Sequence, residues 1–104
     1  MLDSRLHVLR KLQQTQTNER ITLNASSKHG VVEVAFVALR EDDNALVVRR
    51  HGGALAFVPL DFVRASWREE RPHGTRYCVR VTRVGWRRLV YAPRGGRPQL
   101  TRVV

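Results

Sequence analysis

Arginine side chains gathered in the last part of the chain are the groups best suited to do chemistry. Residues 64–104 contain eleven arginines and two acidic residues, Glu69 and Glu70, which gives a net charge of 11 − 2 = +9. Residues 1–63 contain eight basic and seven acidic residues, a net charge of 8 − 7 = +1. A concentrated positive field attracts polyanions, nucleic acid above all, by displacing their condensed counterions. The asymmetry therefore predicts an anionic partner.

We expect these arginines to contact phosphate groups from the strands of a sheet. Arginine suits phosphate because its planar guanidinium group donates two hydrogen bonds at once. Arginines two residues apart on one strand are separated by about 7 Å, which is comparable to the phosphate spacing of a nucleic-acid strand. The candidate phosphate-binding residues are Arg64, Arg68, Arg76, Arg80, Arg87 and Arg88. A solvated polar face that only keeps the fold soluble is the alternative interpretation.

Aromatic side chains among the arginines extend the prediction to single strands, because unpaired bases stack on exposed rings. Trp86, in a predicted turn that starts at Gly85, and Tyr91 are the candidate stacking residues. Trp67 and Tyr77 alternate with polar residues, and we expect both to pack in the core.

Three His-Gly pairs recur at a spacing of 22 residues, at 29–30, 51–52 and 73–74. The spacing indicates two strands per unit, with each pair at the turn of a new hairpin. In an up-and-down sheet these turns share one end, so His29, His51 and His73 would line one rim and could bind zinc. No cysteine cluster or neighbouring carboxylate supports this site. We therefore expect turn histidines on the surface and no metal.

Signals for catalysis are weak. Cys78 has no histidine close to it in sequence, which indicates a buried, inert thiol. No glycine-rich loop has the lysine and serine or threonine that a nucleotide site needs. A metal-independent ribonuclease needs arginine, tyrosine and histidine, and a loose set is present: His73, Arg76, Tyr77, Arg80 and Tyr91. We expect no catalytic residue and no cofactor, and a ribonuclease is the third hypothesis.

One helix and a series of short strands would position these residues. Leucines at three- and four-residue spacing predict an amphipathic helix over residues 3–14, within an N-terminal segment 1–19 that ends in a polar connector. From residue 20 the period changes to two, and residues 20–104 form the β part of a single domain. Residues 93–104 are either a flexible basic tail or a last strand.

Within the β part, Val63, Ala65 and Trp67 are expected to face inward together. A turn at Gly85 and Trp86 is expected to lead into a strand near Arg87–Tyr91. Short strands about every 11 residues predict an all-β, mainly antiparallel domain: a small twisted barrel or sandwich of six to eight strands with one N-terminal helix.

This outline is similar to that of Sm-like and other SH3-type small barrels. Val63-Arg64-Ala65-Ser66 resembles their Ile-Arg-Gly element, with Ala65 in place of the glycine. The similarity covers four residues and serves as a fold-class analogy, without assigning a family.

The sequence predicts a non-enzymatic nucleic-acid-binding protein that contacts phosphates and discriminates little between bases. The prediction covers DNA and RNA, single and double strands. The second hypothesis is a protein–protein adaptor or inhibitor, such as a phage- or plasmid-type regulator or an assembly subunit, whose arginines grip an acidic surface. The two-sided apolar strand Val31–Leu39 fits a homo-oligomer interface. No apolar run is long enough to span a bilayer, and the single Cys78 forms no internal disulfide, so we expect a cytoplasmic protein without membrane contact. Association with a nucleoid or a virus particle stays an alternative.

Overall fold

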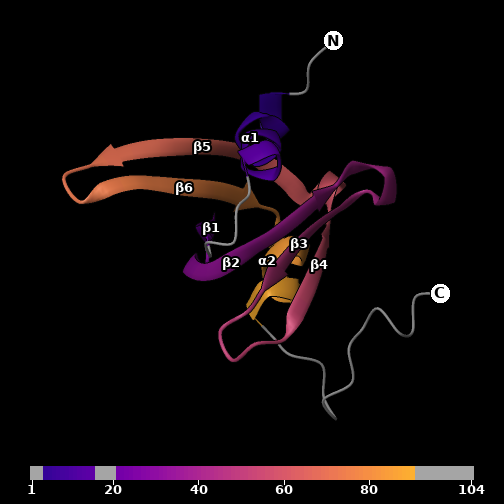
Figure 1. The fold of residues 1–104 in the computed structure, drawn as a ribbon. Coiled ribbons are helices and arrows are strands. Elements are labelled where there is room, and N and C mark those ends of the chain that lie inside the picture. Colours follow the sequence, from indigo (N-terminus) through magenta and orange to yellow (C-terminus); the bar gives the residue numbers. More distant parts are fainter. Residues whose placement is uncertain (1–3, 16–20, 91–104) are drawn as a thin grey trace.

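In a computed structural model, which describes residues 4–15 and 21–90, the chain forms a six-stranded sheet and two α-helices (Figure 1). The helices are α1 (His7–Thr15), which continues the 3-10 turn η1 (Ser4–Leu6), and α2 (Arg83–Val90). The strands are β1 (Ile21–Ser27), β2 (Gly30–Arg40), β3 (Ala45–Arg49), β4 (Leu55–Pro59), β5 (Val63–Arg71) and β6 (Gly74–Val81). Two further 3-10 turns, η2 (Glu41–Asp43) and η3 (Leu60–Phe62), join β2 to β3 and β4 to β5.

A four-stranded antiparallel meander, β1 to β4, and the hairpin of β5 and β6 build the sheet, in the strand order β4-β3-β2-β1-β6-β5. All neighbouring strands are antiparallel except β1 and β6, which run parallel with Leu23 beside Tyr77. The prediction of a mainly antiparallel β domain of short strands with an N-terminal helix is confirmed. β4 and β5 are edge strands, so the sheet stays open and is not closed into a barrel.

Each His-Gly pair lies at the turn of one hairpin, as its spacing indicates. The three turn glycines have φ values of 138°, 99° and 132°, a region that glycine enters without strain. The expectation that all three turns share one rim is wrong. Because β1 and β6 run parallel, the β5–β6 turn with His73 lies at the opposite end of the sheet from the turns with His29 and His51.

Both helices cover the same face of the sheet and share one hydrophobic core with it. Alternate strand residues such as Leu23, Val48 and Val79 are fully buried on this inner face, where Leu9 of α1 and Leu89 of α2 join them. In Figure 1, α2 lies behind β3 and β4. On the other side, which we call the outer face, no helix of the described part of the chain covers the sheet.

A bulge in β5 exchanges the sheet faces, inner and outer, to which the side chains after it point. The pairing with β6 shifts between Val63 and Ala65, which leaves Arg64 as an extra residue. Because strand side chains alternate, a slip of one residue moves each later side chain to the other face. Val63 is in the core as predicted, but the inward orientation predicted for Ala65 and Trp67 is wrong, and both lie on the outer face.

Helix α2 replaces the turn and the strand that the sequence pattern predicts near Arg87–Tyr91. Thr82 caps its N-terminus, where Oγ1 accepts a hydrogen bond from the N–H of Gly85 at 3.2 Å. Gly85 and Leu89 are buried whereas Arg87 and its neighbours on the helix surface are exposed, which is the period of a helix and not of a strand.

Strand β2 contains the predicted strand Val31–Leu39 and pairs with β1 on one side and β3 on the other. Self-association through this strand stays a prediction and would use its outer face, because both edges are occupied. Neither α1 nor α2, the α-helices of the described residues, has the length and apolar character needed to cross a membrane. Tyr91 and residues 93–104 lie outside the described residues.

Candidate nucleic-acid interface

Helix α2 presents an arginine face to solvent. Arg83, Val84, Arg87 and Arg88 are exposed, and the other half of the helix packs toward the sheet. Residues three and four positions apart are neighbours on a helix surface, so the guanidinium groups lie on one side. In residues 4–15 and 21–90, no carboxylate forms an ion pair with any of these three arginines. The α2 face is therefore a cationic surface that no carboxylate of the described residues neutralises through an ion pair.

Close packing fixes the orientation of α2. A Cβ atom placed on Gly85 would lie 3.1 Å from the Cβ atoms of both Phe62 and Val81, so only glycine lets the helix approach this closely. At the next position, the ring of Trp86 packs over Gly30 in the β1–β2 turn, 3.9 Å from the point where a Cβ atom added to Gly30 would lie. The helix is held between β6, η3 and the first hairpin.

Two guanidinium groups are ordered by the helix and its neighbours. Arg50 donates hydrogen bonds to the carbonyl oxygens of Leu89 and Val90, at 3.0 and 3.1 Å, where the partial negative charge of a helix C-terminus favours a cation. The Cζ atom of Arg88 lies 5.9 Å from the ring centroid of Phe62, a cation–π contact. Both contacts restrict the motion of charged side chains around α2.

A second set of arginines lies on the outer face of the sheet. Arg76 and Arg80 are four residues apart on β6 and both are exposed. The Cζ atom of Arg80 lies 5.5 Å from the ring centroid of Trp67 on the neighbouring strand β5. Arg64, at the bulge, is also exposed, and no carboxylate in the described part of the chain forms an ion pair with Arg64 or Arg80.

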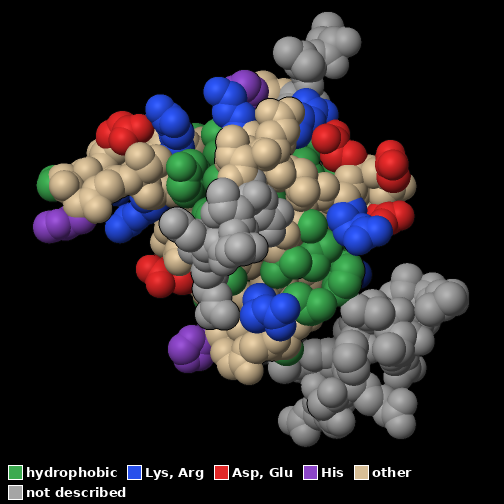
Figure 2. Space-filling model, in the orientation of Figure 1, with side chains coloured by type: hydrophobic (Ala, Val, Ile, Leu, Met, Phe, Trp, Pro, Cys, Tyr) green, Lys and Arg blue, Asp and Glu red, His purple; other side chains and the backbone are tan. Residues whose placement is uncertain are grey.

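The remaining arginines of the β5–β6 hairpin are paired with carboxylates. Arg71 Nη2 lies 2.7 Å from Glu69 Oε1, and Arg68 Nη2 lies 3.3 Å from Glu70 Oε2. β1 pairs only with the second half of β6, so the end of this hairpin projects beyond the sheet (Figure 1). Figure 2 shows acidic and basic side chains interspersed along the projecting arm. The arm therefore adds little to a cationic surface.

The six predicted arginines are thus divided between two surfaces and one neutralised arm. Arg87 and Arg88 lie on α2, over the inner face, whereas Arg76 and Arg80 lie on the outer face. The single sheet face that the sequence predicts is wrong because the last predicted strand is a helix. Arg83 is missed for the same reason, although Thr82 as a helix cap is a signal that could have found it.

The two tryptophans exchange the roles that the sequence predicts. Trp86, the candidate stacking residue, packs against the core. Trp67, the predicted core residue, is half-buried on the outer face, and its Nε1 donates to Glu69 Oε2 at 3.0 Å. The hydrogen bonds from Trp67 and from Arg71 lower the pKa of the Glu69 carboxyl below its ordinary value.

The residues of the ribonuclease hypothesis do not converge in the structure. Tyr77 packs against the core on the inner face, whereas Arg76 and Arg80 lie on the outer face. In residues 4–15 and 21–90, no three His, Cys, Asp or Glu side chains are placed to hold a metal ion. Cys78 is buried, and burial raises the pKa of its thiol, which agrees with the predicted inert role.

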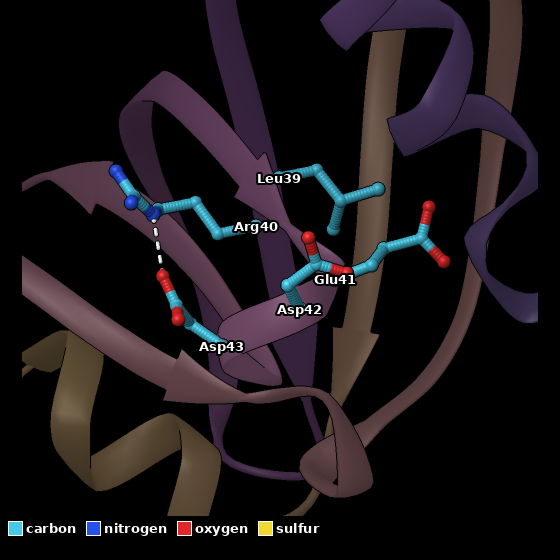
Figure 3. A pocket seen from close by; sticks show the side chains of 5 residues that line it. All are labelled: Leu39, Arg40, Glu41, Asp42 and Asp43. Carbon is cyan, nitrogen blue, oxygen red and sulfur yellow. Dashed lines mark hydrogen bonds and ion pairs between the residues drawn. The ribbon is translucent and has the colours of Figure 1, made fainter.

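A shallow acidic pocket lies at the corner between β2 and β3, lined by Leu39, Arg40, Glu41, Asp42 and Asp43. Figure 3 shows that its carboxylates do not converge: Asp43 points to Arg40, and Glu41 points away from both. Arg40 Nε binds Asp43 at 2.8 Å, and Glu41 accepts two hydrogen bonds from Arg10 of α1, at 2.8 and 3.0 Å. The corner therefore anchors α1 to the sheet.

Comparisons of the chain with protein-family models, with curated proteins and with solved structures found no match.

Proposed function

We propose that this chain is a non-enzymatic nucleic-acid-binding protein of the cytoplasm, and that the arginine face of α2 contacts the phosphate groups. The observation that carries the proposal is the exposure of Arg83, Arg87 and Arg88 together on one helix, without a carboxylate partner among the described residues. The wider sequence supports it, because residues 71–104 contain nine arginines and no acidic residue. Guanidinium groups arranged in this way attract a polyanion and donate to its phosphate oxygens.

The rigidity of α2 favours binding, because side chains on a fixed helix lose less freedom when they meet a ligand. The helix has eight residues, which at about 1.5 Å per residue gives a length of about 12 Å. That length matches a short stretch of one phosphate backbone. Contacts to phosphates position a protein but read no bases, so we expect little sequence discrimination.

Salt dependence of binding tests the proposal. The affinity of the protein for a labelled DNA duplex would be measured by fluorescence anisotropy over a series of salt concentrations, and compared with that of the triple variant R83Q/R87Q/R88Q. Each phosphate contact contributes about 0.9 to the slope of log K against log salt on B-DNA. Loss of three contacts should therefore reduce the slope by up to about 2.7.

The matched control is the triple variant K11Q/R40Q/R49Q, which removes the same charge from exposed positions on α1, β2 and β3. Its slope should stay close to that of the original protein. An equal fall of the salt slope in both triple variants would contradict a special role of α2. Absence of binding to DNA and RNA at low salt would contradict the whole proposal. A protein partner that is retained after nuclease treatment would favour the adaptor hypothesis instead.

A further inference from the structure

The outer face of the sheet brings an aromatic ring, an arginine and two uncharged polar side chains together. Trp67 on β5 and Cys78 on β6 are direct neighbours, and Asn24 on β1 is the next residue across the sheet. One step along the same strands, Arg80 lies beside Ser26. Neighbouring strands are about 4.8 Å apart, so the group spans about 10 Å.

The ring of Trp67 is held in a defined orientation. Its Nε1 donates to Glu69 Oε2 at 3.0 Å, and Arg71 donates to the other oxygen of the same carboxylate at 2.7 Å. The guanidinium group of Arg80 lies over the ring, with its Cζ atom 5.5 Å from the ring centroid, so the charge covers one face of the indole. An unpaired base can stack on a guanidinium plane that lies over an aromatic ring, or on the ring itself when the guanidinium group moves to the phosphate.

The polar side chains beside this ring are available to a ligand. Asn24 and Ser26 are half-buried on the outer face, and neither forms a side-chain hydrogen bond within the described part of the chain. An amide and a hydroxyl both donate and accept, so they suit the polar edge of a base. Cys78 lies between Asn24 and Trp67 in the sheet, but its side chain is buried, so it underlies the other side chains and offers no polar contact to a ligand.

We propose that Trp67, Arg80, Asn24 and Ser26 form a stacking subsite for an unpaired nucleobase, so that the partner of this surface is a single strand. This inference rests on the proposed nucleic-acid-binding function and names the strand form that the outer face accepts. A duplex keeps its bases stacked inside, where Trp67 does not reach them. The subsite lies on the face opposite to α2, so it is separate from the α2 phosphate contacts.

Tryptophan fluorescence provides a direct test, because the chain has two tryptophans that report on different faces. The variant W86F leaves Trp67 as the reporter, and W67F leaves Trp86. Each variant, confirmed as folded by circular dichroism, would be titrated with oligo(dT), oligo(U) and a DNA duplex. We expect quenching of Trp67 emission by at least one of the two single strands. The duplex should quench Trp67 little, and in the W67F variant the single strands should not quench the remaining Trp86 emission more than the duplex does.

Affinity measurements complete the test. The variant W67A should bind the quenching oligonucleotide about tenfold more weakly than the original protein, while its affinity for the duplex is unchanged. Unchanged Trp67 emission with both single strands, or equal quenching by the duplex, would overturn the inference. A difference between oligo(dT) and oligo(U) assigns the strand to DNA or RNA and supports the subsite in either case.

The failure of this subsite and the failure of the proposed function give different results. If the salt slope of R83Q/R87Q/R88Q falls while the Trp67 emission of W86F stays constant, the α2 contacts stand and the stacking subsite is wrong. If no ligand binds at low salt, both are wrong. Quenching of Trp67 with an unaltered salt slope in the α2 variant supports the subsite and contradicts the role of α2.

Discussion

The Nε atom of Arg50, in the turn after β3, lies 3.0 Å from the carbonyl oxygen of Leu89 in the last turn of α2. A second hydrogen bond joins Arg50 Nη2 to the carbonyl of Val90 at 3.1 Å. Replacement R50Q should lower the free energy of unfolding by about 1–2 kcal/mol, because two charged hydrogen bonds to a helix C-terminus are lost. Denaturant unfolding followed by circular dichroism measures this loss.

The neighbouring Arg49 provides the control for that measurement. It is exposed, and its guanidinium group donates to the carbonyl of Gly53 within its own hairpin, at 2.8 Å. R49Q should change the stability by less than about 0.5 kcal/mol. Equal losses in both variants would show that Arg50 does not fix α2.

Gly85 should not tolerate alanine, although alanine is the better helix former. The added Cβ would lie 3.1 Å from two Cβ atoms, of Phe62 and Val81, which are fixed to their backbones and cannot swing away. Overpacking of this kind costs about 1–3 kcal/mol, and the gain in helix propensity is about 1 kcal/mol. We expect G85A to lower the melting temperature. V84A, on the exposed side of α2, should leave it nearly unchanged, and a more stable G85A would contradict the packing described here.

The pH response of Trp67 follows from the carboxylate that binds it. Hydrogen bonds lower the pKa of Glu69 in the folded protein. Ionised Glu69 therefore contributes its full stabilisation of the folded protein above the ordinary pKa of a glutamate. That contribution is lost as the pH falls through the lower pKa of the folded state. The indole N–H resonance of Trp67 should shift with a midpoint below the ordinary pKa of a glutamate. The Trp86 resonance should stay constant in that range, and a midpoint at or above the ordinary value would contradict the pairing.

Cys78 should resist alkylation in the folded protein. Burial raises the pKa of its thiol, and the thiolate is the reactive form. At mildly alkaline pH we expect labelling by iodoacetamide to be at least about tenfold slower than in denaturant. W67A should accelerate the labelling, because Trp67 is the direct cross-strand neighbour of Cys78. Equal rates in folded and unfolded protein would show that the thiol is accessible.

Local patterns in the sequence were sufficient for the hairpins. Alternating residues and the turns, three of which carry a His-Gly pair, locate them, because both signals depend on neighbours in the chain. The parallel pairing of β1 with β6 depends on contacts between distant segments, and no local pattern indicates it. For that reason the rim of three histidines is wrong, although each of the three turns is right.

The candidate site was predicted less well than the fold. The charge asymmetry points to residues 64–104, but the face of the sheet on which each side chain lies depends on single residues that the pattern does not identify. The extra residue Arg64 turns Trp67 outward, and Thr82 starts a helix that turns Trp86 inward. In both cases the tryptophan lies on the opposite side from the one predicted, and no residue next to it in the sequence indicates this.

The parallel pair of β1 and β6 also sets the order in which the protein can be completed during synthesis. Leu23 and Tyr77 lie side by side but are 77 − 23 = 54 positions apart. Each hairpin can form soon after it leaves the ribosome, whereas β1 keeps an unpaired edge until β6 has emerged. A nascent chain that stalls before β6 would therefore expose that edge to other chains, and completion of the sheet would wait for β6, the last of its strands to be synthesised.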